Sequence, residues 1–165
     1  YAPLGCIGIH YSLLSERRGG APLNWAIIDG LRKSGITLFF YNEGVDTGDI
    51  IAQKEFEITD IDTPRELLDK ICILAPEIIE ENINSIENGT VLRIKQDERM
   101  ATYTKSRKPE DGLIDWNKQI DEIYNFIRAI APPYPCAFTC LGDKKLAISK
   151  VTRKAGKLYI EGVIE

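Results

Sequence analysis

His10 is the only histidine among the 165 residues, and it ends a short apolar run. A second polar segment, NEGVDTGD at residues 42–49, follows another apolar run. Ligands of open α/β sheets bind at the carboxyl ends of the strands, so neighbouring strands would bring His10 against Glu43, Asp46 or Asp49. A carboxylate beside a histidine fixes the tautomer of the imidazole and prepares the ring for proton transfer near neutral pH.

Each of these features also has a structural explanation. A single histidine at a strand end is more often structural than catalytic. Gly44 and Gly48 supply the backbone angles of a turn, and turn aspartates bond to nearby backbone groups. Arg17 and Arg18 fit a solvated surface pair. A catalytic site is favoured because a histidine loop and an acidic, glycine-rich loop follow two successive apolar strands.

The first 90 residues predict alternating strands and helices. Strands are predicted over residues 6–10, 36–41 and 50–58, and the second is apolar enough to be buried on both faces. Helical spacing predicts helices over 21–33 and 63–87. The capping box Thr-Pro-Arg-Glu opens the second helix, and a proline inside it predicts a kink.

The rest of the chain predicts a different set of elements. A short strand over 91–95 is followed by a long loop, a helix that Asn117 caps and that runs to about residue 131, and strands from 137 onward. We therefore expect an α/β fold, in which a partial sheet with flanking helices precedes a helix and the start of a small β-rich C-terminal region.

Composition limits the partners and the setting. A formal net charge of −4 argues against a broad surface for nucleic acid or anionic membrane. No apolar run reaches the roughly 20 residues that span a bilayer, so we expect a cytoplasmic protein with no membrane partner. The four cysteines and one histidine do not form a four-ligand zinc pattern. We therefore expect no metal, and buried, reduced cysteines.

The segment from His10 to Ile50 resembles the formyltransferase family that uses 10-formyltetrahydrofolate. The family pattern is a histidine followed by S-L-L-P-x-x-R-G-x-x-P, then T-G-[VI]-T and G-x-D-[TS]-G-[DN]-I. This chain has SLL at 12–14, RG at 18–19, Pro22, SGIT at 34–37 and GVDTGDI at 44–50. The resemblance implies a Rossmann-like sheet whose first part precedes Tyr1, so we expect an N-terminal portion to be missing.

The resemblance also implies roles for particular residues. His10 and Asp46 correspond to the family's catalytic pair, and 10-formyltetrahydrofolate is the implied formyl donor. The implied wall of the pterin pocket is formed by Asn42, Glu43, Gly44, Val45 and Asp46. The implied contacts of the second substrate are Ser12, Arg18 and Tyr134.

Two residues depart from the family pattern. The family has an asparagine two residues before the histidine, which holds the formyl oxygen, and Gly8 occupies that position. Glycine has no side chain to donate, so a backbone N–H or a water would have to stabilise the oxyanion. Ser15 replaces a proline in the loop after Leu14.

The downstream sequence bears on the acceptor. Residues 101–139, with RKPEDGLIDW and PPYPCAF, resemble sugar N-formyltransferases, which favours the amino group of a nucleotide-linked amino sugar. Methionyl-tRNA formyltransferase, which shares the IDW and IRA elements, is the alternative, and tRNA would then be the partner. A degenerate folate- or ligand-binding module is the non-enzymatic alternative. We place the end of the catalytic domain at residue 106 and assign 107–165 to the linker, helix and β-rich region. A homo-oligomer stays open.

Overall fold

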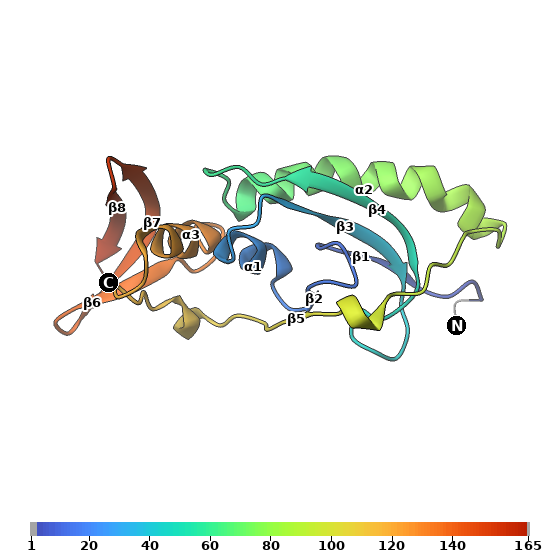
Figure 1. Ribbon diagram of the computed structural model, residues 1–165, viewed down its shortest axis with the longest axis horizontal. Helices are drawn as coiled ribbons and strands as arrows, with labels where there is room; N and C mark the ends of the chain where they lie inside the picture. The colour runs from blue at the N-terminus through green and yellow to red at the C-terminus, as the bar shows by residue number, and fades with distance from the viewer. Residues whose placement is uncertain (1–2, 165) are drawn as a thin grey trace. The chain divides into compact units, whose positions relative to one another are not determined.

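Strand β3 (Lys33–Phe40) is the centre of the first sheet in the computed structural model, which describes residues 3–164 (Figure 1). It lies between β1 (Ile7–His10) and β4 (Ile50–Glu57), and both neighbours run antiparallel to it. Seven of its eight residues are buried, as the unbroken apolar run predicts.

The direction of these strands corrects one expectation. β1 and β3 are neighbours, but they are antiparallel, so their carboxyl ends lie at opposite ends of the pair. His10 is opposite Thr37 in the middle of β3. The loop after β3 must therefore fold back to reach His10. Gly48 permits this return, because a Cβ atom at that position would lie 1.6 Å from the carbonyl oxygen of Phe40.

Helix α2 (Pro64–Glu87) lies along the sheet and begins where the capping box predicts (Figure 1). The backbone N–H of Thr63 donates to Glu66 at 2.7 Å, and the hydroxyl of Thr63 accepts from the N–H of Arg65 at 3.2 Å. Lys54 of β4 bonds to Glu77 and Glu81 of the helix. Four apolar residues of the helix are buried: Leu67, Ile71, Ile78 and Ile86.

A second, two-stranded sheet was not predicted. β2 (Arg18–Gly19) pairs in parallel with β5 (Tyr103–Thr104), which follows the 3₁₀ helix η1 (Glu98–Met100). The sequence predicts a loop at 11–20 and a strand at 91–95. Instead, Ile94 makes only an isolated bridge to Ile50. The pairing joins residues 85 positions apart, and nothing in the local sequence of either strand indicates it.

The C-terminal region contains η2 (Pro109–Gly112), α3 (Ile120–Ala129) and three antiparallel strands in the order β6-β7-β8. These strands are β6 (Ala137–Leu141), β7 (Lys144–Lys154) and β8 (Lys157–Ile164). Apolar side chains of α3 pack against β7 to form a core that includes Ile123, Ile127, Ile148 and Val151. The α/β class with a β-rich C-terminal region is thus confirmed.

Two helix boundaries differ from the predictions. α3 begins two residues later than predicted, because its N-cap is Gln119, which forms a capping box with Glu122, whereas Asn117 bonds locally to Asp115. α1 (Pro22–Ile28) ends early, because Gly30 turns the chain with a φ of +68°.

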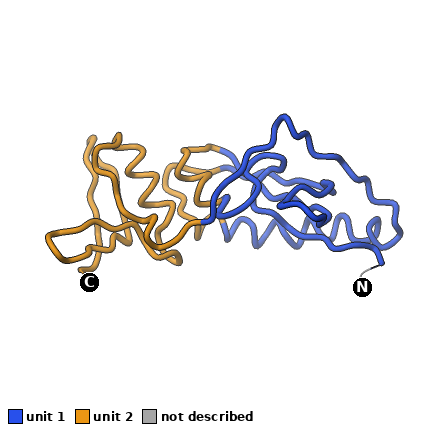
Figure 2. The backbone as a smooth tube through the Cα atoms, turned by 90° about the horizontal axis from the view of Figure 1, so that it is seen from below, with its two compact units in different colours: residues 1–22, 33–57, 68–106 blue, residues 23–32, 58–67, 107–165 orange. Residues whose placement is uncertain are grey.

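The chain divides into two compact units (Figure 2). Unit 1 contains residues 1–22, 33–57 and 68–106, and unit 2 contains residues 23–32, 58–67 and 107–165. Within unit 2, the side-chain amide of Asn24 in α1 donates to the carbonyl of Ala129 at 2.7 Å. The segment after β2 is therefore tied to α3.

The cysteines correct another expectation. None of the four forms a disulfide, but Cys6, Cys72 and Cys140 are exposed and Cys136 is half-buried, so the interpretation as buried residues is wrong. Among residues 3–164, no helix is long and apolar enough to cross a bilayer. Over the same residues, no three His, Cys, Asp or Glu side chains gather in a way that could hold a metal ion.

Candidate active site

The ring of His10 lies between two oxygen acceptors in unit 1. Nε2 is 2.8 Å from the carbonyl oxygen of Arg17, and Nδ1 is 3.5 Å from Oδ2 of Asp46. A carbonyl oxygen can only accept, so Nε2 carries the hydrogen in the first contact. The His10 side chain is 9% exposed, so the ring is nearly enclosed between these two oxygens.

Asp46 is held in place by the backbone of β2. The N–H of Gly19 donates to the same Oδ2 atom at 2.7 Å, and this bond aims the carboxylate at His10. Asp46 has a φ of +53°, in the left-handed region that aspartate tolerates better than most residues. The structure thus brings together the two side chains that the sequence predicts to be catalytic.

Gln96 fixes the loop that carries Asp46. Its side-chain amide donates to the carbonyl oxygens of Asp46 and Gly48, each at 2.8 Å. Its Oε1 atom accepts two bonds from Arg18, at 3.0 Å and 2.8 Å. One side chain therefore joins the acidic loop to β2.

Arg18 is fully buried, and all five of its N–H donors are occupied. Besides the two bonds to Gln96, it donates two to Glu98, at 3.0 Å and 2.7 Å, and one to the hydroxyl of Tyr103 at 2.9 Å. The hydrogen bond to Glu98 raises the pKa of Arg18, so the guanidinium is permanently charged. Arg18 has no donor left for a substrate, and we reassign it from substrate binding to positioning the loop.

Ser12 also bonds within the protein. It is 1% exposed, and its hydroxyl donates to the carbonyl of Glu16 at 2.7 Å. Its own carbonyl accepts from the hydroxyl of Thr37 at 2.7 Å, and that hydroxyl accepts from the N–H of Leu14 at 3.0 Å. These bonds fix the loop after His10, so Ser12 supports the site rather than presenting a free hydroxyl to a ligand.

The other predicted binding residues lie in two places. Asn42 closes the acidic loop by accepting from the N–H of Gly44 and the hydroxyl of Thr47, while Glu43 and Val45 are exposed. Tyr134 belongs to unit 2, where it is half-buried against the core of α3 and the C-terminal sheet. The roles of these residues remain predictions.

No local sequence pattern marks the residues that support the site. Gln96, Glu98 and Tyr103 lie in a segment without helical or strand periodicity. Each acts through a bond to Arg18, about 80 residues away in the chain. A buried arginine needs hydrogen-bond partners, but the sequence does not show that Arg18 is buried, since an arginine is more often a surface residue.

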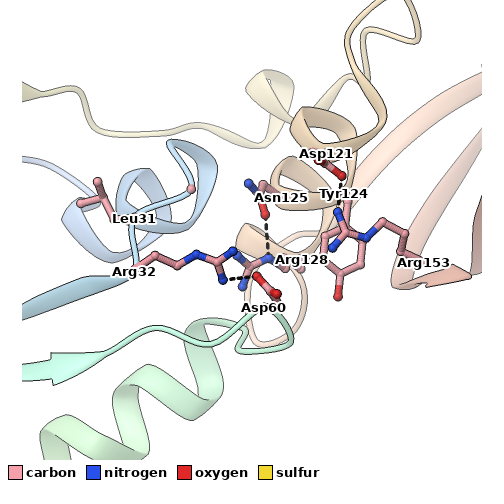
Figure 3. Close-up of a pocket in the computed structure, with 9 residues that line it drawn as sticks. Leu31, Arg32, Asp60, Asp121, Tyr124, Asn125, Arg128 and Arg153 are labelled. Atoms are coloured by element: carbon pink, nitrogen blue, oxygen red, sulfur yellow. Dashed lines mark hydrogen bonds and ion pairs between the residues drawn. The ribbon is translucent and has the colours of Figure 1, made fainter. Parts of the chain in front are cut away.

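A polar pocket lies within unit 2, with a volume of about 170 Å³ (Figure 3). Its charged side chains bond to one another: Arg32 to Asp60 and Arg153 to Asp121. Arg128 donates to Asn125 at 3.0 Å and to the carbonyl of Thr59 at 3.2 Å, and burial lowers its pKa. These contacts stabilise the fold of unit 2, and none of the predicted site residues lines this pocket.

Comparison with known families places the chain that carries His10 and Asp46 in one of them. A family model described as "Formyl transferase" matches residues 1–83, and one described as "Formyl transferase, C-terminal domain" matches residues 107–160. The first alone covers half of the chain. The chain therefore belongs to the formyl transferase family.

Particular relatives are similar over nearly all of the chain. The methionyl-tRNA formyltransferase of Ruminiclostridium cellulolyticum is 40% identical over 148 residues, which are 90% of this chain and 47% of the relative. The solved methionyl-tRNA formyltransferase of Clostridium thermocellum has a TM-score of 0.79 at 28% identity, covering 98% of this chain and 69% of that chain.

A sugar enzyme is also similar in structure. The N-formyltransferase of Helicobacter canadensis, solved with folinic acid and dTDP-3-aminofucose, has a TM-score of 0.72 at 25% identity. The match covers 94% of this chain and 62% of that chain. The chain spans a little under half the length of the curated relative described above.

Proposed function

We propose that the intact protein transfers a formyl group from 10-formyltetrahydrofolate to a primary amine. The observation that carries the proposal is the fixed His10–Asp46 pair, 3.5 Å apart, in a chain of the formyl transferase family. The exposed residues of the 42–45 segment fit one wall of a pterin site. A solved relative that holds folinic acid supports a folate donor.

The proposed reaction forms one C–N bond and breaks another. The amine nitrogen attacks the formyl carbon, and the formyl oxygen becomes an oxyanion. His10 acts as the base in the neutral tautomer that has its hydrogen on Nδ1, facing Asp46. The amine takes the place of the Arg17 carbonyl beside Nε2, and this unprotonated nitrogen accepts the proton that the amine loses. The bond from the formyl carbon to N10 then breaks, and the proton passes to N10. The products are a formamide and tetrahydrofolate.

Asp46 keeps its charge throughout this sequence. It orients the His10 ring through Nδ1 and stabilises the imidazolium that forms. Because Gly19 fixes the carboxylate, Asp46 is already in position when the proton reaches His10. General acid–base catalysis of this kind contributes roughly 10²–10⁴-fold to the rate.

Two acceptors carry a suitable amine, and a separate observation favours each. The curated relatives named methionyl-tRNA formyltransferase favour an aminoacyl-tRNA, and residues 144–157 contain six lysines or arginines and no acidic residue. The PPYPCAF motif and the likeness to the Helicobacter canadensis enzyme favour a nucleotide-linked amino sugar.

The test is a formylation assay with the intact protein. We expect tetrahydrofolate to form only when an amine acceptor is present, and the acceptor to gain the mass of one formyl group. Methionyl initiator tRNA and a panel of nucleotide amino sugars are compared at equal concentration. Binding of folinic acid without turnover of any acceptor would instead indicate the degenerate binding module and overturn the proposal.

We also propose the division at residues 106 and 107 as the end of the catalytic domain. The two family matches support it, since one ends at 83 and the other begins at 107. Limited proteolysis of the intact protein tests it. We expect the first cuts within 105–110, where the residues are largely exposed.

A further inference from the structure

The ring of Tyr41 fills the space that a side chain at residue 8 would need, on the face of the sheet that carries His10. Side chains alternate along a strand, so Gly8 and His10 point to the same side of β1. Gly8 is paired with Phe39, and the N–H of Tyr41 donates to the carbonyl of Cys6 at 2.8 Å. Cross-strand partners share a face, so Tyr41 also lies on the His10 side.

The hydroxyl of Tyr41 stands where a side chain at residue 8 would be. A Cβ atom built on Gly8 would lie 2.3 Å from that oxygen and 2.5 Å from the ring carbon that bears it. In asparagine, the amide nitrogen and oxygen are each about 2.4 Å from Cβ. The phenol oxygen is therefore at the distance from residue 8 where the donor of an asparagine would be found.

The ring of Tyr41 is anchored while its hydroxyl stays available. Its edge packs on Phe39, with ring centroids 5.1 Å apart at an angle of 70°. Among residues 3–164, the hydroxyl has no hydrogen-bond partner, and the residue is 57% exposed. The Tyr41 hydroxyl can therefore donate a hydrogen bond to a ligand on the sheet face that carries His10.

We propose that the Tyr41 hydroxyl is the oxyanion donor of this site, in place of the asparagine that Gly8 replaces. The proposal rests on the formyl transfer proposed above. The phenol O–H donates a hydrogen bond to the formyl oxygen as the oxyanion develops, and the proton stays on the phenol oxygen. Gly8 is then required because any larger residue would displace the phenol from its place.

The first test compares Tyr41→Phe with Tyr159→Phe in the intact protein. Tyr41→Phe keeps the ring on Phe39 and removes only the hydroxyl. Loss of one oxyanion donor lowers kcat by about 10²-fold, and we expect little change in KM for either substrate. Tyr159 is an equally exposed tyrosine on β8, and its variant should keep the wild-type rate. A wild-type kcat for Tyr41→Phe would overturn the proposal.

The second test moves the donor back to residue 8. Tyr41→Ala should lose about 10²-fold in kcat, and Gly8→Asn added to it should recover at least about tenfold, because the space is free and the amide supplies a donor. Failure of the double variant to recover, while its melting temperature matches that of Tyr41→Ala, would show that residue 8 does not face the oxyanion.

The same assays separate this proposal from the proposed function. An active wild type with an inactive His10→Ala variant supports formyl transfer, and unchanged turnover in Tyr41→Phe then contradicts only the role of Tyr41. A folded wild type that formylates neither acceptor overturns both.

Discussion

At the scale of single residues, Oδ2 of Asp46 has two neighbours with different effects, the N–H of Gly19 and the ring of His10. The N–H of Gly19 holds the carboxylate at 2.7 Å, while the longer 3.5 Å separation from His10 leaves room for the ring to respond to a proton. Position and charge are thus supplied by different bonds, so they can be tested separately.

Asp46→Asn removes the charge and keeps the size of the side chain. We expect kcat to fall by about 10²–10⁴-fold, because the imidazolium of His10 loses its counter-charge. The melting temperature should change little, since an amide oxygen can still accept from Gly19. Asp143→Asn, at an exposed turn, controls for the loss of one negative charge. Unchanged kcat in Asp46→Asn would remove this residue from the mechanism.

At the scale of elements, β2 and β5 hold the acidic loop through the donors of Arg18. Arg18→Lys keeps the charge but has three donors on one nitrogen, so it cannot reach Gln96, Glu98 and Tyr103 together. We expect a loss of about 2 kcal/mol in the free energy of unfolding, measured by urea denaturation. Arg99→Lys is the matched control, because Arg99 is 88% exposed and its loss should stay within about 0.5 kcal/mol.

The same network predicts a dependence of stability on pH. The hydrogen bond from Arg18 lowers the pKa of Glu98, so the charged carboxylate stabilises the folded state at neutral pH. That contribution is lost as the pH falls through the lowered pKa and the carboxylate is protonated. The wild type should therefore have a higher melting temperature than Glu98→Gln at pH 7, and the difference between the two melting temperatures should decrease toward about pH 3. A gap that is constant over this range contradicts the assignment.

What the sequence predicts at this scale depends on whether the signal is local. The apolar run of β3 and the capping box at Thr63 are local patterns, and both predictions are confirmed. Strand direction is not local, because an apolar run is the same in parallel and antiparallel sheets. The buried network of Arg18 could not be predicted for the same reason, since it depends on a pairing across 85 residues. Sheet geometry leaves Glu43, Asp46 and Asp49 open as the partner of His10, and the family motif selects Asp46.

For the whole molecule, the net charge of −4 conceals an uneven distribution. The six basic residues within 144–157 lie on or next to β7, whereas the remainder of the chain is strongly acidic. The total charge therefore does not exclude tRNA as the acceptor, because phosphate contacts depend on the local field. Replacing basic residues of β7 and its turn can therefore distinguish a tRNA acceptor from a nucleotide sugar.

Lys144, Lys154 and Lys157 are exposed, and replacing all three with alanine tests which acceptor the protein uses. For a tRNA acceptor, we expect kcat/KM to fall at least about tenfold and the slope of its logarithm against log salt to flatten by up to about three. For a nucleotide sugar, neither quantity should change, because one small phosphate group does not span the strand. Lys33→Ala, an exposed lysine paired with Glu55, is the control and should leave both acceptors unaffected. A tRNA-active protein whose rate is insensitive to the triple change would place the tRNA on another surface.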